Sequence, residues 1–356
     1  MNGKYIKYIS VLIIVSIIIF AVVTRDESET PLKDTPTVSN SAFIMDTFIQ
    51  MQLYGTENPE VINKSFDRLR EVENLFSKNI ETSDVYRINN NAGQEVEVHA
   101  NTIKIIQKAK EYSELTSGKF DVSIGPLLEL WGIGTENPRV PREEEIEEAK
   151  AKVDYRNIEV NEEKQTVRIQ ENMKLDLPAI VKLGYSGSEL REIIRDAEDL
   201  PAAFISLGGD VLVFGDKPDG STWRIGIQDP RIQQYRGNLA LAVELTGDNI
   251  ITTSGNYERY FIEDGELYHH IFDPDTGRPV QNNLRSVTLI TDNSFDADVF
   301  ATSLYIMGLE KGMEFVKNHL ENTEAIFITD DLKAIATAGL DGKLEVLNED
   351  FEILFE

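Results

Sequence analysis

Residues 203–214 read AFISLGGDVLVF, two short apolar segments separated by a Gly-Gly pair. The segments 203–207 and 211–214 predict consecutive β-strands, because each is apolar, brief and bounded by glycine. Gly208 and Gly209 leave two interpretations open: a tight hairpin turn or bulge, or a turn whose free amides approach a phosphate or a flavin edge. The pattern matches neither the Walker A sequence nor the G-x-G-x-x-G fingerprint, so it supports neither a P-loop nor a Rossmann site.

Apolar periodicity on both sides of this pair indicates a mixture of strands and helices. The expected elements are a strand over 42–54, helices over 62–75, 102–115, 142–150, 190–197 and 297–319, a hairpin over 158–169, short strands within 223–262 and further strands over 325–355. Strands come in pairs and helices fall between the pairs, without regular β-α alternation. We therefore expect an α+β fold, a single large domain of paired antiparallel strands with packed helices.

The composition excludes several classes of protein. With 35 Lys and Arg against 62 Asp and Glu, the net charge of −27 argues against nucleic acid as a partner, since binding to phosphate backbones depends on basic side chains. Hydrophobic residues make up 41% of the 356 residues, which excludes wholesale disorder. The chain has no cysteine, so disulfides, thiolate nucleophiles and cysteine-ligated metals are excluded.

Residues 1–25 predict an export signal or a membrane anchor, because two lysines precede an apolar run over 8–23. The run has no A-x-A-like cleavage pattern and the chain has no cysteine to carry a lipid, which favours an uncleaved hydrophobic anchor helix over a cleaved signal. The lysines would keep the N-terminus in the cytoplasm and place the body on the extracytoplasmic face of the cell membrane. A polar linker over 26–40 and one folded domain over 41–356 are expected to follow.

Asp298 and Thr302 stand four residues apart near the start of the predicted helix 297–319, so both face the same side. A carboxylate and a hydroxyl are hard oxygen ligands, suited to Mg²⁺ that also binds phosphate oxygens and water. The alternative is an aspartate favoured by the helix dipole and a threonine bonded back to the helix. The spacing leaves both interpretations open.

Residues 268–279 read YHHIFDPDTGRP and hold two of the four histidines of the chain. Proline and glycine make the Asp-Pro-x-Thr-Gly part a rigid turn, which would hold whichever histidine faces inward near Asp273. A histidine beside a carboxylate can act as a base or contact a phosphate near neutral pH. The alternative is a turn with incidental histidines.

Seven segments, taken in order, resemble the FAD:protein FMN transferase family, or ApbE family, over about residues 43–340. The segments are MDT at 45–47, SDVYRIN at 83–89, SGKFDVSIGPL at 117–127, SLGGD at 206–210, TSGNY at 253–257, HIFDPDTGRP at 270–279 and ADVFAT at 297–302. The resemblance implies an exported, Mg²⁺-dependent α+β enzyme. Such an enzyme cleaves the pyrophosphate of FAD, passes the FMN moiety to a Ser or Thr hydroxyl of a partner flavoprotein, and releases AMP.

The resemblance also implies roles for individual residues. His270 lies beside the reacting phosphate, and with Asp273 it forms the expected catalytic pair. The backbone carbonyl of Ala179 joins Asp298 and Thr302 as a Mg²⁺ ligand. The residues implied to bind FAD are Met45, Asp84, Gly118, Phe120, Asp121, Ser123, Lys182, Ser206, Gly208, Gly209, Asp210, Ser254 and Gly255.

One segment departs from the family close to the expected chemistry. Where the family usually has DLGGIAKGY, residues 176–185 read DLPAIVKLGY. Pro178 removes an amide donor and fixes φ, and Ala179 adds a Cβ. The extra Leu183 shifts the following glycine relative to the preceding lysine, so altered phosphate contacts are expected here.

Two further departures concern the enclosure of the pocket. Asn79 stands where an aromatic residue is often found, and Asn256 where an aspartate is common. A less enclosed pocket would admit water as the acceptor. The alternatives to transfer are therefore a Mg²⁺-dependent FAD pyrophosphatase, which yields FMN and AMP, and a non-catalytic FAD-binding protein.

Overall fold

The computed structural model describes residues 35–197, 200–231 and 237–356. The expected anchor over 1–25 lies outside these residues, and within them no helix has the length and apolar character needed to cross a membrane. The first strand, β1 (Thr37–Ile44), begins inside the segment predicted to be the linker. The folded body therefore starts earlier than the predicted residue 41.

A nine-stranded sheet forms the centre of the molecule, with the order β1-β2-β6-β7-β10-β15-β16-β17-β19. Its strands after β1 are β2 (Thr47–Tyr54), β6 (Ala202–Leu207), β7 (Asp210–Gly215), β10 (Asn249–Gly255), β15 (Leu284–Thr291), β16 (Thr323–Thr329), β17 (Lys333–Ala336) and β19 (Glu352–Phe355). All neighbours pair antiparallel except β17 and β19, which are parallel.

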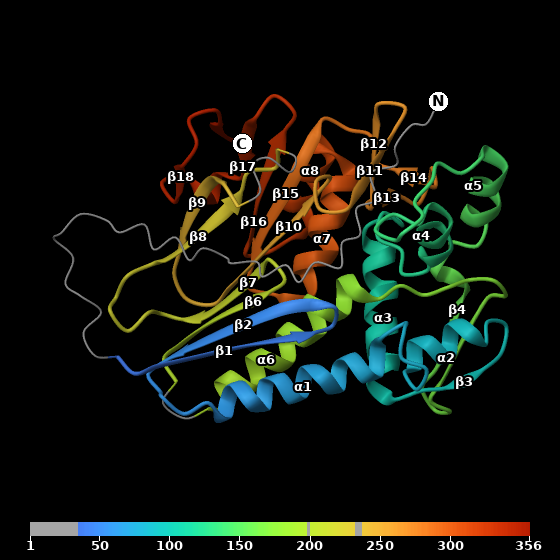
Figure 1. Ribbon diagram of the computed structural model, residues 1–356, viewed down its shortest axis with the longest axis horizontal. Helices are drawn as coiled ribbons and strands as arrows, with labels where there is room; N and C mark the ends of the chain where they lie inside the picture. The colour runs from blue at the N-terminus through green and yellow to red at the C-terminus, as the bar shows by residue number, and fades with distance from the viewer. Residues whose placement is uncertain (1–34, 198–199, 232–236) are drawn as a thin grey trace, which may run out of the picture.

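Smaller sheets and helices surround this sheet (Figure 1). The other strands are β3 (Val96–Glu97), β4 (Ile158–Asn161), β5 (Thr166–Ile169), β8 (Trp223–Gln228), β9 (Leu239–Leu245), β11 (Tyr260–Glu263), β12 (Glu266–His269), β13 (Phe272–Asp273), β14 (Arg278–Pro279) and β18 (Leu344–Val346). The helices are α1 (Glu60–Phe76), α2 (Asp84–Asn90), α3 (Ala100–Leu115), α4 (Gly125–Trp131), α5 (Glu143–Lys150), α6 (Ser186–Arg195), α7 (Ser294–Met307) and α8 (Leu309–His319), with short helices η1 (Tyr155–Asn157), η2 (Ala179–Tyr185) and η3 (Ala338–Leu340). The predicted α+β fold is confirmed.

The alternating side chains of the central sheet divide the interior into two faces. Ile49 and Met51 of β2 pack with Leu69 of α1 in one core. On the opposite face Tyr54 packs edge-on against Trp223 of β8, with ring centroids 5.7 Å apart. Helices therefore cover one face, and the three-stranded sheet β18-β9-β8 covers the other.

Two predicted elements are each divided in the structure. The strand expected over 42–54 is the hairpin β1–β2, whose turn residues Met45 and Asp46 both have φ of 55°. Neither is glycine, so Asp46 is the only turn-forming residue there, a weak signal. The helix expected over 297–319 is α7 and α8, which separate at Gly308 with φ of 79°. The predicted hairpin over 158–169 is confirmed as β4–β5.

The segment with the extra Leu183 folds as a π-helix, η2. A π-helical turn bonds residue i to i+5 and so holds one residue more than an α-helical turn. The extra residue is accommodated in this way, while Gly184 still contacts α7. A Cβ on Gly184 would lie 3.1 Å from Cδ1 of Phe295, and its carbonyl accepts a hydrogen bond from Ser294 Oγ at 2.9 Å.

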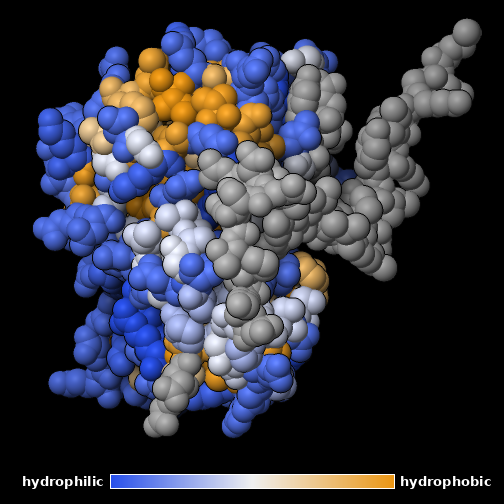
Figure 2. Space-filling model, turned by 90° about the vertical axis from the view of Figure 1, so that its left-hand side faces the viewer, coloured by the Kyte–Doolittle hydropathy of each residue, from blue (hydrophilic) through white to orange (hydrophobic). Residues whose placement is uncertain are grey.

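Both edges of the central sheet expose apolar side chains. The β1–β2 hairpin exposes Phe43 by 71% and Phe48 by 38%, and at the other edge β19 exposes Phe355 by 41%. Figure 2, which views the side of the molecule where β8, β9 and β18 lie, shows hydrophobic colour gathered in its upper part. These edge residues contribute little to the core, so they suit conservative control substitutions.

Trp131 should be a stability determinant, because its fully buried Nε1 donates a hydrogen bond to the carbonyl of Gly277 at 3.0 Å. Trp131→Phe removes this donor, so we expect the free energy of unfolding to fall by about 1–3 kcal/mol in urea titrations. The control Phe355→Leu changes an exposed residue and should stay within about 0.5 kcal/mol of the parent. Equal midpoints for both variants would contradict this assignment.

Candidate functional site

The Gly208–Gly209 pair forms the hairpin turn between β6 and β7. The amide of Gly208 donates to the carbonyl of Phe48 at 3.0 Å. A Cβ on Gly208 would lie 1.9 Å from Oγ1 of Thr47 and 3.2 Å from Nζ of Lys182, whereas a Cβ on Gly209 would meet nothing within 4 Å. The hairpin interpretation is confirmed, and the turn has one packed side and one open side.

Asp210 joins this turn to a cation and to the next strand. Its Oδ2 lies 3.4 Å from Nζ of Lys182, and its Oδ1 accepts a hydrogen bond from Thr252 Oγ1 at 2.6 Å. Lys182 comes from η2, the segment that departs from the family pattern. The substitutions and the extra residue in that segment therefore leave its lysine facing the Gly-Gly turn.

Asp298, on the second turn of α7, lies close enough to Asp210 and Lys182 for their charges to act on its carboxyl group. Burial raises the pKa of its carboxyl, and the negative charge of Asp210 raises it further, while Lys182 and Arg259 act in the opposite direction. In the part of the chain that the structure describes, this carboxylate makes no hydrogen bond or ion pair. A half-buried carboxylate in this state is suited to a cation.

Thr302 lies one helical turn beyond Asp298, and its hydroxyl oxygen is 3.1 Å from that of Ser254 at the end of β10. The neighbouring Ser303 is the residue that donates back to the helix, to the carbonyl of Val299 at 2.7 Å. The interpretation of Thr302 as a back-bonded helix residue is therefore not supported.

The predicted Mg²⁺ ligands lie on elements that touch, because η2, which begins at Ala179, packs against α7. Within residues 35–197, 200–231 and 237–356, no group of three or more His, Asp or Glu side chains is arranged to hold a metal. The donors present are one uncompensated carboxylate, a hydroxyl and backbone oxygen. This sparse set fits Mg²⁺, which takes few protein ligands when phosphate oxygens and water complete its shell.

The two histidines have different surroundings. His269 is buried, with Nε2 2.7 Å from the carbonyl of Val280. His270 is half-buried, and its backbone amide and Nδ1 lie 3.1 and 3.3 Å from the carbonyl of Arg259. Burial, followed by the charges of Arg259 and His269, lowers the pKa of His270 to about 3. The imidazole is therefore neutral near pH 7, and in the absence of a ligand it is a weak base.

Asp273 does not pair with either histidine, which corrects the expected catalytic pair. Its Oδ1 lies 2.9 Å from Nζ of Lys119, which also binds Asp275 at 2.7 Å. The carbonyl of Asp273 accepts the amide of Gly277 at 2.8 Å and so closes the rigid turn. The turn is confirmed, but it directs this carboxylate to the loop after α3.

Two of the residues expected to bind FAD, Asp84 and Asp121, accept hydrogen bonds from the protein's own backbone. The buried carboxylate of Asp84 forms an ion pair with Arg87 and accepts from the amide of His99 at 2.7 Å. Asp121 accepts from Ser123 through its amide at 2.8 Å and its hydroxyl at 2.6 Å, and from the amide of Tyr155 at 3.1 Å. These side chains shape the loops that carry them, and their predicted contact with FAD stays a prediction.

The remaining predicted residues divide between core and site. Phe120 is buried in the main core, and Gly118, with φ of 82°, follows the end of α3. Met45, at the β1–β2 turn, places its sulfur 3.8 Å from Ser186 Oγ near the start of α6. Ser206 is buried with no hydrogen-bond partner for its hydroxyl among the described residues. Gly255 has no room for a side chain, because a Cβ would lie 2.4 Å from the ring of Tyr257.

Arg259 lies near the predicted site residues His270 and Asp298, but it was not predicted as a site residue from the sequence. Its charge lowers the pKa values of both His270 and Asp298, which come from different elements. The available signal was its position two residues after the segment 253–257, in an acidic chain where basic residues are outnumbered.

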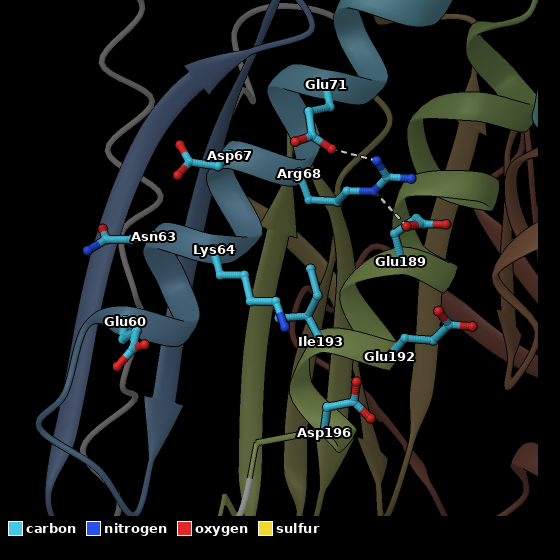
Figure 3. Close-up of a pocket in the computed structure, with 10 residues that line it drawn as sticks. All are labelled: Glu60, Asn63, Lys64, Asp67, Arg68, Glu71, Glu189, Glu192, Ile193 and Asp196. Carbon is cyan, nitrogen blue, oxygen red and sulfur yellow. Dashed lines mark hydrogen bonds and ion pairs between the residues drawn. The ribbon is translucent and has the colours of Figure 1, made fainter. Parts of the chain in front are cut away.

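A groove of about 610 Å³ between α1 and α6 is separate from this group (Figure 3). Arg68 crosses it and binds Glu71 and Glu189, each at 2.6 Å, and also donates to the hydroxyl of Tyr185 at 3.0 Å. None of the predicted site residues lines the groove. We interpret it as an ion-paired seam that fastens α1 to α6 and to the end of η2.

Comparison with known proteins identifies relatives over nearly the whole chain. A model of the ApbE family matches residues 45–327. A Klebsiella pneumoniae (strain 342) protein named FAD:protein FMN transferase is 33% identical over 327 residues, which is 91% of this chain and 99% of the relative. The ApbE protein of Thermotoga maritima has a TM-score of 0.74 and 31% identity, covering 87% of this chain and 96% of its own. The apo flavinyl transferase ApbE of Pseudomonas stutzeri has a TM-score of 0.72 and 26% identity, over 84% and 93% of the two chains.

The contact between Gly208 and Thr47 predicts different tolerance at the two turn glycines. Both have positive φ, 66° and 112°, so alanine strains the backbone at either position. Only at Gly208 does the new Cβ also overlap Thr47. We expect Gly208→Ala to lower the free energy of unfolding by about 1–3 kcal/mol more than Gly209→Ala, as measured by urea titration. Equal losses for the two variants would contradict the packing described.

Proposed function

This chain belongs to the ApbE family, and from this premise we propose that it transfers the FMN moiety of FAD to a Ser or Thr hydroxyl of a partner flavoprotein. AMP is the second product. The observation that carries the proposal is that the family match over 45–327 includes every element of the site: the β1–β2 turn, η2, the Gly-Gly turn, the end of β10, His270 and α7.

The proposed reaction exchanges one phosphorus–oxygen bond for another. The acceptor hydroxyl oxygen forms a bond to the phosphorus of the FMN phosphate, and the bond from that phosphorus to the bridging oxygen breaks. AMP leaves with the bridging oxygen. The hydroxyl proton passes to the imidazole of His270, which is neutral near pH 7. The negative charge of a bound pyrophosphate would raise the lowered pKa of this imidazole and so strengthen it as a base.

The chain's own residues bind and orient the pyrophosphate. Lys182 supplies positive charge beside the Gly-Gly turn, and the open side at Gly209 allows a phosphate to approach the backbone. Asp298, Thr302 and the carbonyl of Ala179 would hold Mg²⁺, which when bound supplies further positive charge for the phosphate oxygens.

Hydrolysis of FAD to FMN and AMP is the second candidate function. The observation that favours it is Asn79, which is exposed in the loop after α1 at a position where the family often has an aromatic residue. A small polar side chain there leaves the acceptor side open to water. Both functions need the same groups around the phosphate, and they differ in the acceptor.

The first experiment measures AMP release from FAD by the purified protein, with Mg²⁺ or EDTA, and with or without an acceptor domain that bears a Ser or Thr. Acceptor-dependent AMP with covalent fluorescent flavin supports transfer, and acceptor-independent AMP supports hydrolysis. Asp298→Asn should reduce Mg²⁺-dependent AMP release by about 100-fold or more, because it removes the uncompensated charge.

The matched control is Asp296→Asn on the same helix. Asp296 accepts a hydrogen bond from the hydroxyl of Tyr112 at 2.6 Å, which asparagine can also accept. This variant should keep most of the activity. Full activity in Asp298→Asn would overturn the proposed cation site, and no AMP from the parent protein under any condition would overturn both enzymatic proposals.

We also propose that the enzyme works on the extracytoplasmic face of the membrane, held there by residues 1–25. The apolar run over 8–23 after two lysines supports this. Cell fractionation should recover the protein with membranes, accessible to protease added from outside. Ile14→Asp should release or mislocalise it, because a charge at the centre of a span costs about 3 kcal/mol. Recovery of the parent protein from the cytoplasm would contradict this proposal.

A further inference from the structure

We propose that Arg259 binds the pyrophosphate of FAD directly, as a substrate-contacting residue of this site. The assignment rests on the proposed function, since it takes FAD as the ligand. It adds a second cation, from a different part of the chain, to the one that Lys182 supplies.

Arg259 is tied to the candidate base through its backbone. It lies in the connection between β10 and β11, and its carbonyl accepts the amide of His270 at 3.1 Å. The Nδ1 of His270 lies 3.3 Å from the same oxygen. Whatever places His270 beside the reacting phosphate therefore places the backbone of Arg259 there too.

The guanidinium lies within electrostatic reach of both halves of the site. Its charge lowers the pKa of His270, which follows β12, and that of Asp298 on α7. The stem runs along Gly134, where a Cβ would lie 3.3 Å from Cδ of Arg259. A side chain at position 134 would crowd this stem, so the loop after α4 leaves a path for the arginine.

The guanidinium is also uncommitted. Arg259 is exposed, and within the described residues its side chain forms no ion pair or hydrogen bond. Arg68, by contrast, binds two carboxylates, and Lys182 is shared with Asp210 at 3.4 Å. The chain has a net charge of −27 and many carboxylates that could pair with an arginine. An arginine that stays unpaired near Asp298 and His270 is therefore available to bind an anionic ligand.

The guanidinium of Arg259 indicates which kind of ligand it would bind. Guanidinium presents a planar set of donors that fits two phosphate oxygens at once, which ammonium does not. The two carboxylates Asp210 and Asp298 would repel a pyrophosphate unless positive charge offset them. Arg259 and Lys182 together provide this charge, and both act on the Asp298 carboxylate.

The test compares Arg259→Gln and Arg259→Lys with a control, Arg224→Gln on β8, which removes the same charge from an ion pair with Glu345 of β18. Binding of FAD, ADP and riboflavin is measured by calorimetry or flavin fluorescence, with thermal unfolding as a check on folding. Arg259→Gln should weaken the binding of FAD and of ADP by about 10- to 100-fold. The affinity for riboflavin should stay unchanged, because riboflavin has no phosphate. Arg259→Lys should recover part of the loss, and Arg224→Gln should match the parent.

Unchanged affinity of Arg259→Gln for both FAD and ADP would overturn the assignment, as would an equal loss for riboflavin in a folded variant. The result is separate from the proposed function. Failure of the parent protein to release AMP would defeat the enzymatic proposals, whereas the ADP and riboflavin comparison would still decide whether Arg259 binds phosphate.

Discussion

The site depends on the close packing of η2 and α6 against α7. Gly187 allows this approach, because a Cβ there would lie 2.9 Å from Cβ of Ser294, and Gly184 allows it one turn earlier against Phe295. Ser294 secures the contact through the carbonyl of Gly184. This contact brings Lys182 of η2 close to Asp298 of α7. Without this packing, Lys182 would not face the Gly-Gly turn, and Asp298 would be separated from η2, which carries the predicted ligand Ala179.

The sequence predicted most of the fold because its signals were local. Short apolar runs around Gly208 and the amphipathic stripe of α1 depend on neighbouring residues alone. The hairpin turn at Met45 and Asp46 was not predicted, because it holds no glycine or asparagine and Asp46 alone is a weak turn signal. The break at Gly308 was hidden inside a continuous apolar period.

The order of the site segments was also predictable, but the direction of individual side chains was not. Asp84 and Asp121 lie in segments typical of the family, yet their oxygens bind their own loops. Asp273 turns toward Lys119, a residue far away in sequence. A carboxylate in a motif can serve a ligand or the backbone, and the choice depends on which amides and cations tertiary packing brings near it. Arg259 was missed for the same reason.

The π-helix has a consequence for how such a site changes over evolutionary time. Both ends of η2 are held: Asp176, just before it, donates its amide to Val122 at 2.8 Å, and the hydroxyl of Tyr185, at its end, binds Arg68 and Asn101. Between fixed ends, an insertion widens the turn and does not lengthen the helix. A residue can therefore be gained or lost here over evolutionary time while the segments before and after the π-helix keep their positions.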